Sequence, residues 1–171
     1  MPDGNTYAPN AEFTLQQRLV ALGASMTSPM RTPTPRDWAR HLSQWAWSHT
    51  ADLTTAEPCS KHKLLRRFHN EFIRGLAQTA QASVPFFCVI EHSVQGFPHL
   101  HVLLGETEGL TISQVQRRWR AGYSRVRIFN PRNRALFYAV KQCDELNWDY
   151  ELSTKTPRRR SGPAEPGMED R

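Results

Sequence analysis

The sequence of 171 residues has few cysteines and no long apolar run. Its three cysteines, Cys59, Cys88 and Cys143, are far apart and form no C-x-x-C pair. This argues against a disulfide framework and against a cysteine-rich zinc site. No stretch approaches the roughly 18 consecutive apolar residues of a membrane span, so no membrane partner is expected. The N-terminal residues have neither a basic start nor an apolar stretch, so we expect no secretory signal and a cytoplasmic protein.

Acidic residues are absent from one long segment of this basic chain. Between Gly109 and Cys143 there is no Asp or Glu, but there are seven Arg and one Lys, a charge of +8 against a net +6 for the whole chain. A solvated basic face is one interpretation. The segment is long and includes Trp119, Tyr123 and Phe129, which could stack on bases. These features favour a nucleic-acid partner instead.

The composition divides the chain into three parts. Residues 1–37 are expected to be an N-terminal extension with a Pro-rich linker, and residues 153–171 a disordered basic tail rich in Pro and Gly. Residues 38–152 have the patterning of one folded domain. The sequence has no Walker G-x-x-x-x-G-K-[ST] motif, so no helicase domain is expected.

Apolar periodicity in the middle of the chain predicts the order β-α-β-β-α-β-α. This order indicates an α+β domain with one antiparallel sheet of ferredoxin-like, split βαβ topology and helices on one face. The predicted strands are 44–53, 85–93, 98–105 and 125–129. The predicted helices are 60–82, capped by Ser60, 111–123 and 130–148.

Two histidines, His99 and His101, share one side of the strand in "PHLHVLLG". Leu100, Val102 and Leu104 would face the helices, so both imidazoles would lie on an exposed sheet surface. Two imidazoles and one carboxylate can hold a divalent ion as a Lewis-acid site. The third ligand is Glu91. If a β-bulge shifted the alternation of side chains along that strand, His92 would take its place. Alternatively, the histidines are only polar residues on a wet sheet face.

A second pair of residues, Tyr138 and Lys141, lies three apart on the last predicted helix. They would share one face of it, while Leu136, Val140 and Cys143 would be buried on the other. A neighbouring ammonium and a metal-bound phosphate would make the Tyr138 hydroxyl a better nucleophile. The alternative is a core aromatic residue beside a surface charge.

Together these motifs resemble those of a known family. "PHLHVLL" resembles the His-hydrophobe-His motif of the HUH endonucleases, and "YAVK" resembles their Y-x-x-K motif. "FFCVIEHSVQGFPHLHVLL" and "KQCDELNWDYEL" are similar to segments of plasmid and phage rolling-circle replication initiators, and the resemblance covers about residues 43 to 152. The Thr-rich first strand of that family is matched poorly by "WSHTADLT", and only one tyrosine is in place.

The resemblance implies an activity and a set of partners. His99, His101 and Glu91 would hold a divalent metal, Mn²⁺ or Mg²⁺, on the scissile phosphate of single-stranded or hairpin origin DNA. Tyr138 would attack, leaving a 5′-phosphotyrosine and a free 3′-OH, and Lys141 would lower the tyrosine pKa or offset charge. Host helicase and polymerase would be partners, and no small-molecule cofactor is implied. Candidates for contacts to the DNA backbone are Arg117, Arg118, Arg120, Arg125 and Arg127.

Other classes of protein remain open at this point. A non-catalytic single-stranded DNA or RNA-binding module could use the same sheet, and it would keep its affinity in chelator. A transposase or relaxase of the same superfamily is also compatible with the histidine pair. A structural zinc site would need four ligands, which the three scattered cysteines and His92 could supply only by coincidence of fold. A histidine-triad nucleotide hydrolase is not, because Leu103 occupies its third histidine position.

Overall fold

A computed structural model describes residues 34–92, 97–131, 136, 140 and 150–159 of the chain. All of these residues belong to one compact unit that begins at Pro33. Most of the expected N-terminal extension, most of the last predicted helix and the end of the C-terminal tail lie outside the described residues.

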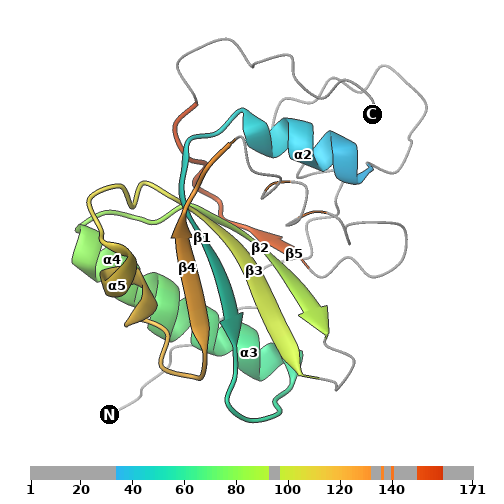
Figure 1. The fold of residues 1–171 in the computed structure, drawn as a ribbon, viewed down its shortest axis with the longest axis vertical. Helices are drawn as coiled ribbons and strands as arrows, with labels where there is room; N and C mark the ends of the chain where they lie inside the picture. The colour runs from blue at the N-terminus through green and yellow to red at the C-terminus, as the bar shows by residue number, and fades with distance from the viewer. Residues whose placement is uncertain (1–33, 93–96, 132–135, 137–139, 141–149, 160–171) are drawn as a thin grey trace, which may run out of the picture. The chain divides into compact units, whose positions relative to one another are not determined.

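One five-stranded antiparallel sheet organises this unit (Figure 1). The strands, in chain order, are β1 (Trp47–Thr54), β2 (Phe86–His92), β3 (Pro98–Gly105), β4 (Ser124–Ile128) and β5 (Tyr150–Leu152). Their order across the sheet is β4-β1-β3-β2-β5, so the first four strands follow the predicted split βαβ plan and β5 extends its edge. The predicted α+β fold is therefore confirmed.

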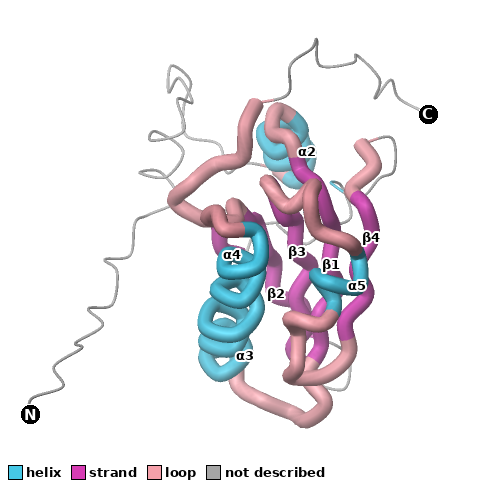
Figure 2. Tube along the Cα trace, turned by 90° about the vertical axis from the view of Figure 1, so that its left-hand side faces the viewer, coloured by secondary structure: helices cyan, strands magenta, loops and turns pink. Residues whose placement is uncertain are grey.

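All the described helical elements except one cover the same face of the sheet, and Figure 2 shows α3 and α4 beside the strands. The helical elements are α2 (Pro35–Ser43), α3 (Lys61–Arg67), the π-helical segment η1 (Phe68–Ile73), α4 (Arg74–Ala80) and α5 (Ile112–Gln116). The segments α3, η1 and α4 follow one another without a break over the predicted helix 60–82. Ser60 caps its start, since its hydroxyl accepts a hydrogen bond from the backbone N–H of Lys63.

The main core lies between this helix-covered face and the sheet. The four apolar residues that the sequence places at helical spacing are fully buried there: Leu64, Phe68, Phe72 and Leu76. Alternate residues of the strands meet them, including Leu100, Val102 and Leu104 of β3. The expected orientation of β3 is thus confirmed, and its odd-numbered residues from His99 to Leu103 point to the other face.

Two elements were not predicted from the sequence. Helix α2 begins inside the expected Pro-rich linker, because Pro35 occupies its first turn and Thr34 forms a capping box with Asp37. Strand β5 has only three residues, too few for a period-two pattern to show.

Helix α5 is shorter than predicted and ends at Gln116. The predicted helix continued to Tyr123, but the chain turns after Arg117. The Trp119 indole N–H then donates a 2.7 Å hydrogen bond to the backbone carbonyl of Thr54. This bond holds the connection between α5 and β4 against the end of β1.

The sheet face away from the main core is not open along its whole length. Trp38 of α2 packs on Phe87 and Tyr150, with ring centroids 5.7 and 4.9 Å apart. Leu103 on the same face is buried. This smaller apolar cluster covers one end of that sheet face. His99 and His101 lie on the part of the face that the cluster does not cover. Among the described residues, none of the helices is both long and apolar enough to cross a membrane.

Candidate metal centre

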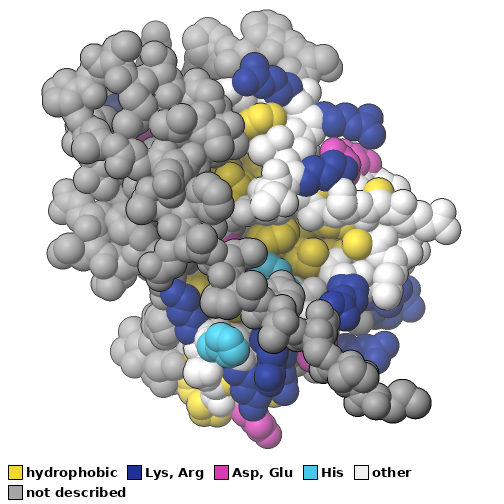
Figure 3. Space-filling view, turned by 180° about the vertical axis from the view of Figure 1, so that it is seen from behind, with side chains coloured by type: hydrophobic (Ala, Val, Ile, Leu, Met, Phe, Trp, Pro, Cys, Tyr) yellow, Lys and Arg dark blue, Asp and Glu magenta, His cyan; other side chains and the backbone are white. Residues whose placement is uncertain are grey.

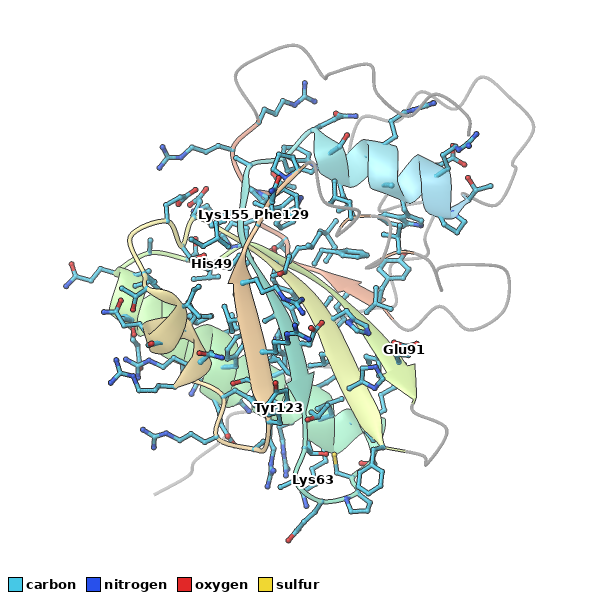
Figure 4. The ribbon with its side chains drawn as sticks, viewed as in Figure 1. His49, Lys63, Glu91, Tyr123, Phe129 and Lys155 are labelled. Atoms are coloured by element: carbon cyan, nitrogen blue, oxygen red, sulfur yellow. The ribbon has the colours of Figure 1, made fainter. Side chains whose placement is uncertain are left out.

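The hairpin of β2 and β3 brings together three side chains that the sequence analysis singled out. Glu91 is the direct antiparallel partner of His99, and His101 lies opposite Val89. Glu91 has the parity of Phe87 and Val89, so its carboxylate points to the same face as both imidazoles. Figure 4 shows Glu91 near the end of β2, on the sheet face turned away from α3 and α4.

The three side chains are in mutual contact. One carboxylate oxygen of Glu91, Oε2, lies 2.9 Å from Nε2 of His99 and 2.6 Å from Nε2 of His101. The two imidazole rings are 4.9 Å apart at their centroids and nearly perpendicular. These contacts confirm that Glu91 groups with the histidine pair. The side chain of His92, the alternative third ligand, lies outside what the structure describes.

This donor set fits a divalent metal ion. Each residue can offer one ligand atom, and these atoms all lie within 4.8 Å of one another. Ligands of one tetrahedral ion with bonds of about 2.1 Å are roughly 3.4 Å apart, so small side-chain movements would suffice. The side chains of Glu91, His99 and His101 are only 16, 20 and 10% exposed, so the expected surface position is in fact a partly buried one.

Asp52 of β1 completes the surroundings of His101. Asp52 and His101 are direct partners in the β1–β3 ladder, and Oδ1 of Asp52 lies 2.9 Å from Nδ1 of His101. A carboxylate at Nδ1 holds the ring so that Nε2 is free to serve as a ligand, as in carboxylate–histidine–metal arrangements. Asp52 was missed in the sequence analysis. The signal was present, because the predicted topology places β1 beside β3 and strand alternation gives Asp52 the same face as the histidines.

The electrostatics of this group follow from its burial and its hydrogen bonds. Burial lowers the pKa of His101, but the hydrogen bonds and charges of Asp52 and Glu91 outweigh it, and the pKa is raised overall. The pKa of Asp52 is lowered, chiefly by its hydrogen bond to His101 and further by the charges of His101, Arg127 and Arg125. The cluster therefore favours a charged, hydrogen-bonded state when no metal is bound.

The structure separates the five arginines expected to contact DNA. Arg125 and Arg127 of β4 alternate with the core residue Val126 and lie on the face of the histidines. Arg125 is paired with Asp52 in the β1–β4 ladder, and a guanidinium nitrogen of Arg127 is 3.5 Å from the other oxygen of Asp52. Two arginines of β4 thus lie two strands from the candidate ligands His99 and His101 and three strands from Glu91.

The other three arginines follow α5. Arg117 donates a hydrogen bond to the carbonyl of Ser113, and the stem of Arg118 packs against Gly75 of α4. Arg120 is in the connection to β4. Several Lys and Arg side chains are visible from behind in Figure 3. The exposed cations of α3, α4, α5 and the turn after α5 are Lys61, Lys63, Arg66, Arg74, Arg117 and Arg120.

The expected nucleophile and its partner, Tyr138 and Lys141, lie outside the described residues. Two of their neighbours are described: Leu136 and Val140 are helical and buried, as expected for the inner side of that helix. Comparisons of the chain with protein-family models, with curated proteins and with solved structures found no match.

Proposed function

We propose that this protein is a metal-dependent endonuclease that nicks single-stranded DNA at a specific sequence and transfers the cut strand, initiating rolling-circle replication. The observation that carries the proposal is the contact of Glu91, His99 and His101 on one face of a split βαβ sheet. Arg125 and Arg127 on the same face supply positive charge where a phosphate backbone would lie.

In this proposal the residues of the chain have distinct roles. Glu91, His99 and His101 hold Mn²⁺ or Mg²⁺, which supplies a Lewis acid for the phosphate oxygens when bound. Asp52 orients His101. The Tyr138 oxygen forms a bond to phosphorus while the bond from phosphorus to the 3′-oxygen breaks, and the phenolic proton ends on that 3′-oxygen. Lys141 offsets the negative charge that develops on the phosphate.

The products define the partners of the reaction. The DNA keeps a 5′-phosphotyrosine bond to the protein and gains a free 3′-OH. A polymerase can extend that 3′-OH, and a helicase must supply more single strand as it is extended. We therefore propose single-stranded or hairpin origin DNA as substrate and the replication proteins of the host cytoplasm as partners. A transposase or relaxase would use the same chemistry on other DNA.

A second candidate is a nucleic-acid-binding module that cuts nothing. It is favoured by the exposed Tyr123 and the exposed arginines of β4, which suit binding without a metal. In that case Glu91, His99 and His101 would be a hydrogen-bonded polar cluster. The two candidates differ in one respect that is easily measured, namely whether the metal is required.

The test is cleavage of a pool of labelled single-stranded oligonucleotides in Mn²⁺ by the full chain. Wild type is expected to produce cut strands and a protein–DNA band that survives denaturation, whereas EDTA abolishes both. Glu91→Gln and His99→Asn are expected to lower cleavage by at least 10²-fold, as loss of a group acting in the transition state does. Cleavage that persists in EDTA and in both variants would refute the proposal.

The matched control is Glu151→Gln. Glu151 makes a contact of the same kind, 2.6 Å from Nε2 of His69, but it joins β5 to the helix-covered face. Glu151→Gln is expected to cut as wild type does. A loss of cleavage in this variant would show that breaking any His–carboxylate contact impairs the protein in general.

A further inference from the structure

The acid-free segment contains five aromatic residues, and the structure describes three of them: Trp119, Tyr123 and Phe129. Trp119 and Phe129 are buried, with 4 and 7% of their surface exposed. Tyr123 is 66% exposed. Since stacking on a nucleotide base requires an accessible ring, Tyr123 is the one of the three that can serve.

Tyr123 lies in line with the metal ligands across the sheet. Its carbonyl accepts a 2.9 Å hydrogen bond from the backbone N–H of Thr54, so the two residues face each other on adjoining strands. Thr54 is in turn the partner of His99, and His99 is the partner of Glu91. Neighbouring strands are about 4.8 Å apart, so the backbones of Tyr123 and His99 are separated by about 10 Å.

The charge along β4 matches this arrangement. Tyr123 has the parity of Arg125 and Arg127, opposite to that of the core residue Val126. Figure 4 shows Tyr123 where the chain enters β4, at the edge of the sheet. Arg125 and Arg127 are exposed. Asp52 shares its two carboxylate oxygens between His101, at 2.9 Å, and Arg127, at 3.5 Å. An exposed ring followed by two guanidinium groups suits one base and its adjoining phosphates.

We propose that Tyr123 is a stacking platform for a base of single-stranded nucleic acid, close to the phosphate that the metal centre holds. The strand runs across the sheet from Glu91 and His99 to the β4 edge, and Arg125 and Arg127 contact its phosphates. One strand of DNA advances about 3.4 Å per nucleotide in a duplex and more when extended. The stacked base is therefore at most about three nucleotides from the bound phosphate. The proposal rests on the proposed function only for the identity of that phosphate.

The first measurement is the affinity of the full chain for a labelled single-stranded DNA oligonucleotide in EDTA, by fluorescence anisotropy. We expect Tyr123→Ala to weaken binding about tenfold or more, because one stacked base is lost. Tyr123→Phe keeps the ring without the hydroxyl and should bind as wild type does. Ile128→Ala removes another exposed apolar side chain of β4, 69% exposed, and should also leave the affinity unchanged.

The second measurement locates the base. A series of oligonucleotides, each with one abasic site, is titrated with wild type and with Tyr123→Ala. At one position the abasic site should weaken binding by wild type but have no further effect on Tyr123→Ala. The proposal is overturned if Tyr123→Ala binds as wild type does, or if every abasic site weakens both proteins equally.

These measurements fail separately from the proposed function, since they are made in chelator and detect no cleavage. If Tyr123 stacks on a base but no metal-dependent cleavage is found, the stacking proposal is supported and the proposed nicking activity is refuted. If the protein cleaves DNA but Tyr123→Ala does not change binding, the nicking activity is supported and the stacking proposal is refuted. If both hold, the cut is expected within about three nucleotides of the sensitive base.

Discussion

The ring of His101 has a carboxylate at each nitrogen, Asp52 at Nδ1 and Glu91 at Nε2. These two contacts have different roles once a metal is bound. In the proposed metal site Glu91 would be a ligand beside His101, whereas Asp52 would keep the proton on Nδ1 and fix the orientation of the ring. At the scale of single residues, the metal affinity should therefore depend on Asp52 although it is not one of the three ligands.

The first prediction concerns this positioning residue. Asp52→Ala should weaken Mn²⁺ binding, measured by isothermal titration calorimetry without DNA, by about 10- to 100-fold. Asp52→Asn retains an acceptor for Nδ1 and should recover part of that loss. Unchanged affinity in Asp52→Ala would show that the orientation of His101 does not depend on Asp52.

A second prediction concerns His49, a buried histidine outside the metal cluster. Burial lowers its pKa, against a smaller opposing effect of Glu108, and its Nδ1 is 2.8 Å from the Thr107 hydroxyl. Since the folded pKa lies below the unfolded value of about 6.5, the unfolded chain binds the proton more readily at acid pH. The stability that neutral His49 contributes is complete above that value and is lost as pH falls below it.

The difference in the free energy of unfolding between wild type and His49→Gln is expected to decrease as pH falls. In urea unfolding at pH 7.5, wild type should be more stable than His49→Gln by about 1 kcal/mol, the contribution of one hydrogen bond. This difference in stability should shrink as pH falls below about 6.5. Thr107→Val removes the partner but leaves the histidine, so it should keep the pH dependence. A difference in stability between wild type and His49→Gln that does not change with pH would contradict this account of His49.

At the scale of elements, the strands and the long helix follow from local patterning. Strand alternation placed His99 and Glu91 on one face, and helical spacing identified Phe68 and Phe72 as core residues. Both patterns involve residues that are close in the sequence, so they can be recognised from the sequence alone. Strand β5 depends on a distant partner strand, and the contact of Asp52 with His101 requires the strand order as well as the alternation. Helix α2 has a local signal in its Thr34–Asp37 capping box, but the neighbouring prolines favour a linker.

The connection into β4 gives a prediction at this scale. Gly122 is enclosed by backbone, and an added Cβ would lie 2.4 Å from both the Thr54 carbonyl oxygen and the Ala56 nitrogen. Gly122→Ala should therefore force β4 away from β1 and destabilise the fold by about 1–3 kcal/mol. Exchange of the Thr54 amide, which is bonded to Tyr123, should become faster.

Gly109 provides the matched control, since an added Cβ there meets nothing within 4 Å. Gly109→Ala should change the free energy of unfolding by no more than about 0.5 kcal/mol. Equal stability of Gly109→Ala and Gly122→Ala would contradict the close approach of the two strands.

At the scale of the whole molecule, the described arginines of the basic segment are divided between two sides of the sheet. Arg125 and Arg127 lie on the face of the candidate metal ligands, whereas Arg117 and Arg118 lie beside the helices. Net charge alone would attract a polyanion to either side. The metal cluster and Tyr123 favour the first side as the path of the single strand.

The salt dependence of binding tests this division. The logarithm of the affinity for single-stranded DNA falls with the logarithm of salt concentration, by about 0.7 for each phosphate neutralised. Changing both Arg125 and Arg127 to Ala should reduce that slope by about 1.4. Changing both Arg117 and Arg120 to Ala removes the same charge and should leave the slope as it is. Equal losses in the two double variants would contradict a single path along β4.

The most direct test of the central claim is to identify the tyrosine that carries the DNA. The covalent product formed in Mn²⁺ is digested with nuclease and trypsin, and the peptide that retains a nucleotide is identified by mass spectrometry. The four tyrosines, at positions 7, 123, 138 and 150, fall in different tryptic peptides. We predict that the nucleotide lies on Tyr138, in the peptide Ala135–Lys141, and that Tyr138→Phe gives none. A nucleotide on another tyrosine, or no covalent product at all, would contradict the account.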